Sequence, residues 1–329
     1  MKFGMNLLLW TDDPTQDSFL PVLQRLKKIG FDGVELPIFT LDEARWKILG
    51  KRLDDLGLGR TAVTVRTLAD SPISPDPAVR AKGVELTKRV LDCMKIVGAT
   101  HLAGPYYAPL GHFSGQGPTA EEWGWAVQGI REVAEYAGKL DITLVLEFLN
   151  RFEIYLLNNA ADAARFAREV GHPACKMMYD TFHANIEEKD IGAALKSCAD
   201  VLAHVHISEN DRSTPGLGQV DWQATFDGLK KIKYDGWLTI EAFGLALPSL
   251  AAATKIWRRM FVSEDQLASD GLRFMKREWA KRSGKKPVVK KAVKAAAKAP
   301  AAKAKPGVKK PAKAKAAASA KKLKTGKKR

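Results

Sequence analysis

Apolar residues in the first 284 positions alternate between short, nearly continuous runs and longer stretches where they recur every three or four positions. Continuous runs are typical of strands buried on both faces, and the longer period is typical of amphipathic helices. The pattern predicts strands at 2–9, 33–38, 60–67, 100–104, 143–148, 175–180, 202–207 and 237–242. It predicts helices near 17–29, 41–56, 77–97, 119–139, 159–170, 190–200 and 222–233, and a longer one from about 247.

Polar turns separate these elements. The Gly-Phe-Asp-Gly sequence at 30–33 indicates the end of a helix, a turn and the start of a strand. Eight strands alternating with helices predict an α/β protein with a (β/α)8 TIM barrel as its single folded domain. A doubly wound parallel sheet is the alternative. The count of eight strands, and the polar residues that end several of them, favour the barrel.

The net charge of +16 comes from one segment. Residues 285–329 hold 18 of the 53 lysines and arginines and no acidic residue, so residues 1–284 carry 35 basic and 37 acidic side chains. Lysine, alanine and proline dominate the segment, which therefore lacks residues for a core, and its charges repel one another. We expect a barrel domain at 1–284 and a disordered basic tail at 285–329. Such a tail suits non-specific binding of nucleic acid or polyphosphate, or serves only as a solubilising extension.

Three cysteines without paired spacing fit a reducing compartment. The apolar run near the N-terminus is too short for a signal peptide, and no run of 18 apolar residues occurs. We expect a soluble, cytoplasmic protein that does not enter the membrane.

Four predicted strands in the second half each end at a residue that can bind a metal ion. Glu147, Asp180, His206 and Glu241 follow one another at 33, 26 and 35 residues, which is the spacing of consecutive βα units. Since the carboxyl ends of barrel strands form one face, these side chains are expected to converge. Three carboxylates and one imidazole suit Mn²⁺, Co²⁺ or Mg²⁺.

The sequence around these strand ends resembles the D-tagatose/D-psicose 3-epimerase group of the xylose isomerase-like barrels. The resemblance rests on the stretches Leu-Glu-Phe-Leu-Asn-Arg-Phe-Glu at 146–153, Asp-Thr-Phe-His at 180–183, His-Ile-Ser-Glu-Asn-Asp-Arg at 206–212 and Thr-Ile-Glu at 239–241. It covers roughly residues 1–280 and excludes the basic tail.

The resemblance implies an isomerase that epimerises ketoses at C3. It also implies one divalent metal ion per subunit, with Mn²⁺ as the first choice and Co²⁺ or Mg²⁺ as alternatives, and a homodimeric or homotetrameric assembly. Glu147, Asp180, His206 and Glu241 would ligate the ion, and Glu147 and Glu241 would exchange the C3 proton from opposite faces. Glu153, His183 and Arg212 would bind the C1 to C3 oxygens of the sugar. Chemistry supports these roles, because epimerisation beside a ketone needs a base, an acid and a Lewis acid that stabilises an enediolate.

Three other functions are alternatives. An aldose–ketose isomerase of the same superfamily, such as one similar to hydroxypyruvate isomerase, would use similar ligands. An endonuclease IV-like repair enzyme would need histidines for three zinc ions, and the chain has six histidines in all. A barrel that only binds nucleic acid would not need the four ligands.

Several residues near the strand ends have two interpretations. We expect His204 and His206 on opposite faces of their strand, with His204 packed against a helix, and we expect His101 to be structural. Arg66 and Trp10 are candidates for the site, with core packing as the alternative. The segment from Gly104 to Gly117 is a candidate for part of the sugar pocket, with a plain surface loop as the alternative.

Overall fold

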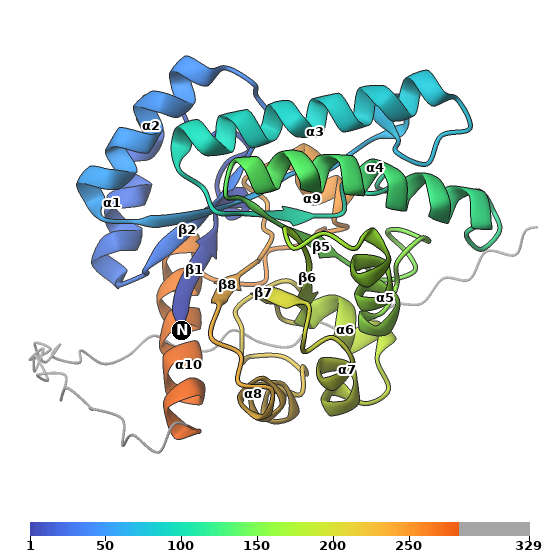
Figure 1. Ribbon diagram of the computed structural model, residues 1–329. Coiled ribbons are helices and arrows are strands. Elements are labelled where there is room, and N and C mark those ends of the chain that lie inside the picture. Colours follow the sequence, from blue (N-terminus) through green and yellow to red (C-terminus); the bar gives the residue numbers. More distant parts are fainter. Residues whose placement is uncertain (283–329) are drawn as a thin grey trace, which may run out of the picture. The chain divides into compact units, whose positions relative to one another are not determined.

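Eight parallel strands close into a barrel in the computed structural model, which describes residues 1–282 (Figure 1). The strands are β1 (Lys2–Asn6), β2 (Gly33–Pro37), β3 (Gly59–Val63), β4 (His101–Gly104), β5 (Thr143–Glu147), β6 (Cys175–Asp180), β7 (Leu202–Ile207) and β8 (Trp237–Ile240). Each strand pairs with its neighbours in chain order, and β1 also pairs with β8. The predicted (β/α)8 TIM barrel is therefore confirmed.

Helices surround the strands and connect them in order (Figure 1). They are α1 (Leu20–Ile29), α2 (Glu43–Leu56), α3 (Pro77–Val97), α4 (Ala120–Lys139), α5 (Ala160–Val170), α6 (Thr181–Glu187), α7 (Ile191–Ser197), α8 (Trp222–Lys231), α9 (Pro248–Ala253) and α10 (Glu264–Lys281). Short 3-10 turns lie at η1 (Leu7–Leu9), η2 (Asp17–Phe19) and η3 (Leu68–Asp70). α10 packs beside α1 and β1, which closes the ring of helices.

The structure differs from the predicted elements at four places. The third strand, predicted at 60–67, spans Gly59–Val63. The first strand ends at Asn6, and the apolar residues after it form η1. The long helix expected from about 247 is two helices, α9 and α10, separated by an irregular segment. The short helix α6 was not predicted; it begins directly after β6, where the Asp180 side chain accepts a hydrogen bond from the backbone N–H of Phe182.

Capping residues explain where many of the helices begin and end. Thr119 and Glu122 form a reciprocal capping box at the start of α4, with bonds of 2.8 and 3.1 Å. Ser263 caps α10 by accepting a hydrogen bond from the Gln266 N–H. Gly30 ends α1 with φ at 106°, a left-handed conformation that glycine adopts without steric cost. The helix stop predicted at this position is confirmed.

The hydrophobic core has two layers, one between the strands and helices and one inside the barrel. The first buries large helix side chains such as Trp46, Phe166 and Phe226. The second is a separate cluster that includes Val145 and Met178. Because side chains two positions apart in a strand share a face, Val145 and Met178 point inward together with the strand-end residues that follow them.

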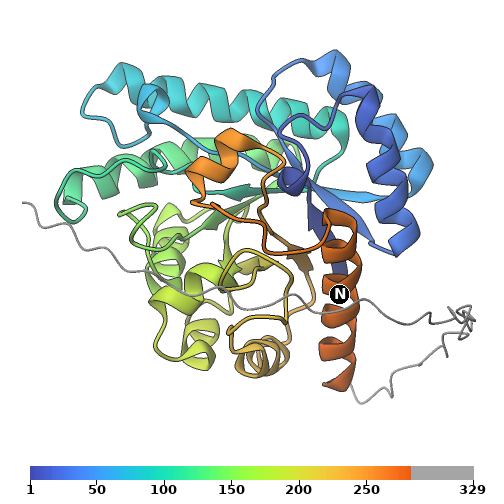
Figure 2. The same ribbon diagram turned by 180° about the vertical axis from the view of Figure 1, so that it is seen from behind.

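The helix α9 contributes to the carboxyl end of the barrel. Figure 2 shows α9 and the segment leading to α10 in orange, in front of the strands. Ser249 and Leu250 of this helix line the same cavity as Glu147 at the end of β5. The connection between β8 and α10 therefore forms part of the barrel mouth.

The basic tail predicted at 285–329 and the domain boundary predicted after residue 284 lie outside the described residues. Within residues 1–282, no helix is long and apolar enough to cross a lipid bilayer.

Candidate metal centre and active site

The structure brings the four predicted ligands together at the carboxyl ends of the last four strands. Glu147, Asp180 and His206 lie at or near the ends of β5, β6 and β7, and Glu241 directly follows β8. Each is buried, and each offers one ligand atom within 4.8 Å of the others. Residues up to 94 positions apart in the chain thus meet because consecutive parallel strands end on one face.

His206 supplies a buried nitrogen that lacks a hydrogen-bond partner. Its Nδ1 lies 3.5 Å from Asp180 Oδ2, 3.5 Å from Glu241 Oε1 and 3.8 Å from Glu147 Oε1, and none of these contacts has hydrogen-bond geometry. An unsatisfied buried nitrogen facing three carboxylates is costly by itself. A divalent cation would bind all four atoms, so the residues present fit a metal ion of the Mn²⁺, Co²⁺ or Mg²⁺ type.

Two carboxylates of this cluster, Glu147 and Asp180, have strongly shifted pKa values. Burial, and then the negative charge of Glu241, raise the pKa of Glu147 well above its usual range. Burial acts against the charge of Asp180 as well, but Arg212 and His206 outweigh it and lower the pKa of Asp180. Glu147 and Asp180 therefore differ in their tendency to carry a proton, because Arg212 and His206 offset the burial of Asp180.

His206 has a raised pKa in this cluster of carboxylates. Burial of the ring favours the neutral form, but the carboxylates of Glu35 and Glu241 raise the pKa of His206 well above its usual range. A protonated imidazole cannot ligate a metal ion, so cation binding here has to release the proton from Nδ1.

Arg212 extends into the same cluster from the loop after β7. Its Nη1 lies 2.6 Å from Glu241 Oε2 and 3.3 Å from Asp180 Oδ2. Its guanidinium also lies 3.8 Å from the ring centre of Phe182. Arg212 has φ at 61°, so a left-handed turn directs this side chain inward. The buried guanidinium balances part of the negative charge of the site.

The other two predicted sugar-binding residues are joined through Asn150. The backbone N–H of Asn150 donates to His183 Nδ1 at 3.0 Å, and its side-chain amide donates to Glu153 Oε1 at 2.8 Å. Burial of the ring, and then the charge of Arg212, lower the pKa of His183 well below its usual value. His183 is therefore neutral; its Nδ1 accepts the Asn150 N–H, and its Nε2 lies 3.0 Å from Arg212 Nη2.

A cavity of about 780 Å³ lies over these residues. Glu153, His183 and Arg212 line it together with Glu147 and Glu241. Its outer wall is apolar and includes Phe39, Leu110, Phe113 and Phe152. The cavity thus has a polar, charged floor beside the candidate metal centre and an apolar rim, a combination typical of small-molecule sites.

Sequence reasoning missed two buried polar residues that contact the candidate metal ligands. Glu35 of β2 accepts a hydrogen bond from His206 Nε2 at 2.6 Å and lies within 3.0 Å of His204 Nε2. Asn6 of β1 donates to Glu35 at 3.0 Å and to Glu241 at 3.3 Å. The available signal was a carboxylate inside an apolar strand, Gly-Val-Glu-Leu-Pro at 33–37, which is costly to bury without partners.

The prediction for His204 was wrong. His204 and His206 both contact Glu35 inside the barrel, and their ring centres are 5.2 Å apart. The physical reason is the two-residue period of a strand, which places positions 204 and 206 on the same face.

Of the remaining candidates, Arg66 and Trp10 have structural contacts, and the segment from 104 to 117 contributes to the cavity. Arg66 pairs with Asp70 at 3.0 Å in the core, and Trp10 packs against the hydrophobic core. Pro105, Leu110, Gly111 and Phe113 line the cavity, which supports a pocket role for the segment from 104 to 117.

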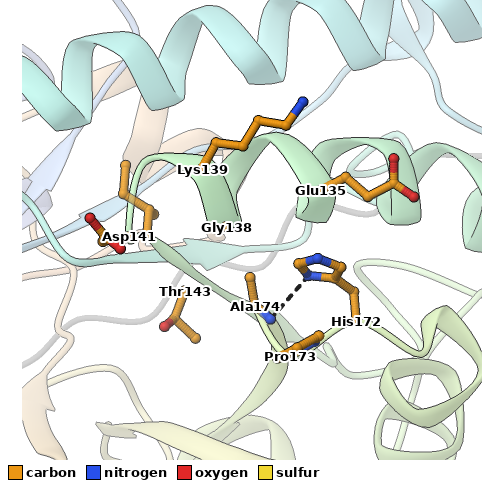
Figure 3. A pocket seen from close by; sticks show the side chains of 9 residues that line it. Glu135, Gly138, Lys139, Asp141, Thr143, His172, Pro173 and Ala174 are labelled. Carbon is orange, nitrogen blue, oxygen red and sulfur yellow. Dashed lines mark hydrogen bonds between the residues drawn. The ribbon is translucent and has the colours of Figure 1, made fainter.

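Another hollow lies apart from this site, between α4 and the turn before β6 (Figure 3). It is lined by residues that include Gly138, Thr143 and His172, and His172 Nδ1 accepts a hydrogen bond from the Ala174 N–H at 3.1 Å. Thr143 begins β5 whereas Glu147 ends it, so this hollow faces the opposite end of the barrel.

Comparisons with known proteins agree with the geometry of the site. The sequence profile of the xylose isomerase-like TIM barrels matches residues 23–278. The chain is 34% identical to L-ribulose 3-epimerase of Mesorhizobium japonicum over 277 residues, covering 83% of this chain and 93% of that protein. It is 33% identical to D-psicose 3-epimerase of Agrobacterium fabrum, covering 78% and 90% of the two chains. The structure of D-allulose 3-epimerase from Methylomonas sp. in complex with D-allulose superposes with a TM-score of 0.79, at 29% identity over 84% of this chain and 97% of that one.

Proposed function

The chain belongs to the ketose 3-epimerases of the xylose isomerase-like TIM barrel family, and from this premise we propose that Glu147 and Glu241 epimerise a ketose at C3. The observation that carries the proposal is the meeting of these two glutamates with Asp180 and His206 in one buried cluster under the cavity. The protein is an isomerase that acts on carbohydrates.

The two glutamates can divide the work of a proton transfer. The C3 proton lies next to the C2 carbonyl, so a carboxylate on one face removes it and a carboxylic acid on the other face returns one. Glu147 and Glu241 come from β5 and the end of β8, which β6 and β7 separate in the barrel.

Glu147, Asp180, His206 and Glu241 would hold one divalent cation per subunit. Mn²⁺ is the first choice of ion, and Co²⁺ and Mg²⁺ are the alternatives. When bound, such a cation supplies a Lewis acid that stabilises the negative charge of the enediolate. The unpartnered Nδ1 of His206 and the three facing carboxylates support this assignment.

Glu153, His183 and Arg212 would bind the C1 to C3 oxygens of the sugar. All three line the cavity. The guanidinium of Arg212 offers planar donors with fixed directions, and the His183 imidazole lies beside it, with Nε2 3.0 Å from Arg212 Nη2. Glu153 accepts from Asn150 with one oxygen, which leaves its other oxygen for a sugar hydroxyl.

The experiment that tests the function measures the products from three ketoses. The full-length protein is incubated with Mn²⁺ and fructose, tagatose or ribulose, and ketoses and aldoses are separated by chromatography. We expect the 3-epimer of at least one ketose to form, and we expect EDTA to stop its formation. Aldose as the main product would replace the proposal with an aldose–ketose isomerase, and absence of turnover on every sugar would contradict it.

The candidate metal ligands argue against the alternative of an endonuclease IV-like enzyme with three zinc ions. Within residues 1–282, the groups of three or more potential metal ligands are the tetrad and the Glu35, His204 and His206 group, which share His206. Three zinc ions would need more independent ligands than these two groups offer.

The assembly and compartment of the enzyme are further proposals. A homodimer or homotetramer rests on the family relationship alone, and sedimentation of the purified protein tests it. A cytoplasmic location is supported by Cys93, Cys175 and Cys198, which are free and buried, as thiols of a reducing compartment can be. Fractionation of the producing cells tests the compartment.

The basic tail adds a second candidate activity. Eighteen positive charges and no acidic residue in 285–329 support non-specific binding of nucleic acid or polyphosphate through release of counterions. A chain truncated after Ser283 should keep its sugar turnover but lose the retardation of a DNA duplex at low salt. Equal retardation by the truncated chain would contradict this proposal.

A further inference from the structure

Glu35 is a fully buried carboxylate in the middle of β2, within hydrogen-bonding distance of the candidate metal ligand His206. It accepts hydrogen bonds from His206 Nε2 at 2.6 Å, Thr61 Oγ1 at 2.8 Å and Asn6 Nδ2 at 3.0 Å. His204 Nε2 also lies 3.0 Å from Glu35, without hydrogen-bond geometry. The shortest of these contacts is therefore the one to the proposed metal ligand.

The contact with Glu35 determines which nitrogen of His206 faces the carboxylate cluster. When Nε2 carries a proton and donates it to Glu35, the neutral ring keeps its lone pair on Nδ1. That Nδ1 faces the carboxylates of Asp180 and Glu241 at 3.5 Å and has no hydrogen-bond partner. A flipped or rotated ring would lose the bond to Glu35 and would direct Nδ1 away from the cluster.

Asn6 connects the same carboxylate to a second proposed ligand. Its Nδ2 donates to Glu35 Oε1 at 3.0 Å and to Glu241 Oε1 at 3.3 Å, while its Oδ1 accepts from the Leu8 N–H at 2.9 Å. The backbone of the turn after β1 thus fixes the orientation of the amide, and the amide fixes the relative position of the two carboxylates.

We propose that Glu35 is a positioning residue that holds the His206 ring with Nδ1 toward the cation, and that Asn6 couples this arrangement to Glu241. The proposal rests on the proposed function, because it assigns these residues a role toward the same metal centre. Carboxylates that accept the second N–H of a ligating histidine typically change metal affinity by about 10- to 100-fold when they are replaced.

Glu35, His204 and His206 also form a group of three potential ligands, but their geometry favours hydrogen bonding over a second cation. Ligand atoms about 2.0–2.2 Å from a metal ion in a tetrahedral arrangement lie about 3.3 Å or more from each other. Glu35 Oε1 and His206 Nε2 are 2.6 Å apart, which leaves no room for an ion between them. Thr61 and Asn6 occupy further hydrogen-bonding positions of the carboxylate.

The test compares Mn²⁺ affinity, measured by titration calorimetry on EDTA-treated full-length protein without sugar, among the wild type and three variants. E35Q removes the charge but keeps the shape, and E35D keeps the charge but withdraws it by one methylene group. T61V removes another partner of Glu35 without touching His206. We expect the Mn²⁺ dissociation constant to rise by about 10- to 100-fold in both E35Q and E35D, and by less than about threefold in T61V.

A second measurement follows the hydrogen bond itself. In the Mg²⁺-loaded protein with ¹⁵N-labelled histidine, NMR should show a downfield, exchange-protected proton on His206 Nε2 in the wild type and in T61V, and not in E35Q. The thermal transition of E35Q reveals whether this variant folds. If it does not fold, the Mn²⁺ dissociation constants of E35D and T61V decide whether Glu35 positions His206.

Wild-type affinity in E35D would overturn a positioning role, since charge alone would then account for any loss in E35Q. Wild-type affinity in E35Q would overturn the proposal altogether. Failure of the proposed function looks different: a wild type that binds Mn²⁺ but turns over no ketose leaves the inference about Glu35 standing.

Discussion

Arg212 Nη1 lies 2.6 Å from Glu241 Oε2, so a residue proposed to bind the sugar directly contacts a residue proposed to carry its proton. The same nitrogen lies 3.3 Å from Asp180 Oδ2. In this arrangement the guanidinium compensates the carboxylates in the way that a bound cation would. Sugar binding and cation binding should therefore respond to Arg212 in opposite directions.

Replacing Arg212 by glutamine should strengthen cation binding while it weakens sugar binding. Loss of a positive charge within 3.3 Å of Asp180 and Glu241 should raise Mn²⁺ affinity by about tenfold. Loss of a charged hydrogen-bond donor should raise KM for the ketose by about 10- to 100-fold. Calorimetry and steady-state kinetics measure the two effects, and R165Q, a change at an exposed arginine of α5, should alter neither. A fall in both affinities would show that Arg212 supports the cation site as well.

The variants E147Q and E241Q should separate proton exchange from epimerisation. Each should reduce epimerisation by about 10²- to 10⁴-fold, because one of the two proton carriers is lost. Each should still exchange the C3 hydrogen of one epimer, the one whose C3–H faces the remaining glutamate. Mass spectrometry of deuterium incorporation at C3 from D₂O, run with both epimers, provides the measurement. Equal exchange of both epimers by one variant would argue against two carriers on opposite faces.

Removal of the metal ion should lower thermal stability as well as activity. A cation at about 100 times its dissociation constant stabilises the folded state by about 2.7 kcal/mol, or a Tm rise of about 5 to 10 °C for a domain of this size. Thermal unfolding with EDTA and then with excess Mn²⁺ measures the rise. The variant D55N, at an exposed aspartate, should show the full rise, whereas D180N should show little of it. A full rise in D180N would place the stabilising ion elsewhere.

The loop that carries Arg212 should depend on the buried carboxylate of Glu209. This side chain accepts hydrogen bonds from the backbone N–H groups of Gly216 and Val220, at 2.7 and 3.1 Å, and from Trp222 Nε1 at 3.1 Å. E209A would leave these donors without partners and should lower the free energy of unfolding by about 2–4 kcal/mol. Urea denaturation measures the loss, and E209Q, which keeps one acceptor oxygen, should lose less. A loss below about 1 kcal/mol in E209A would mean that water replaces the carboxylate.

His101 should make the protein sensitive to mild acid. Burial, and then the charges of His204 and Lys2, lower the pKa of His101 to about 4. The folded state therefore excludes a proton that the unfolded chain accepts near pH 6.5, so stability is present above that pH and falls as the pH drops toward 4. H101Q should lose less stability than the wild type between pH 7 and pH 4.5 in urea denaturation. An NMR titration midpoint of His101 near 6.5 would contradict the prediction.

The barrel and the meeting of four strand-end polar residues could be predicted because both depend on local pattern. A strand buried on both faces consists of a nearly continuous run of apolar residues, so a polar residue at its end is easily recognised. Glu147, which follows Thr-Leu-Val-Leu, is an example. The spacing of βα units then implies that Glu147, Asp180, His206 and Glu241 share one face, and the structure brings them within 4.8 Å.

Other features of the site depend on contacts between residues far apart in the chain. Glu35 precedes His206 by 171 positions, and nothing in the sequence of β2 indicates which histidine its carboxylate meets. Arg212 has a left-handed backbone conformation that directs its side chain to Glu241. No local sequence pattern predicts this loop conformation.

By itself, the sequence determined the (β/α)8 barrel and the four candidate ligands, because strand period, helix period and strand-end polarity are all properties of neighbouring residues. The resemblance of the stretches around the strand ends indicated the family. Only the tertiary structure decided the contacts of these candidate ligands: Glu35 bonds to His206, Asn6 bonds to both Glu35 and Glu241, and Arg212 pairs with Glu241. The physical reason is that closure of the barrel brings β1, β2, β7 and β8 around one interior. The hydrogen-bond partners of the buried polar groups there depend on this closure and cannot be read from neighbouring residues.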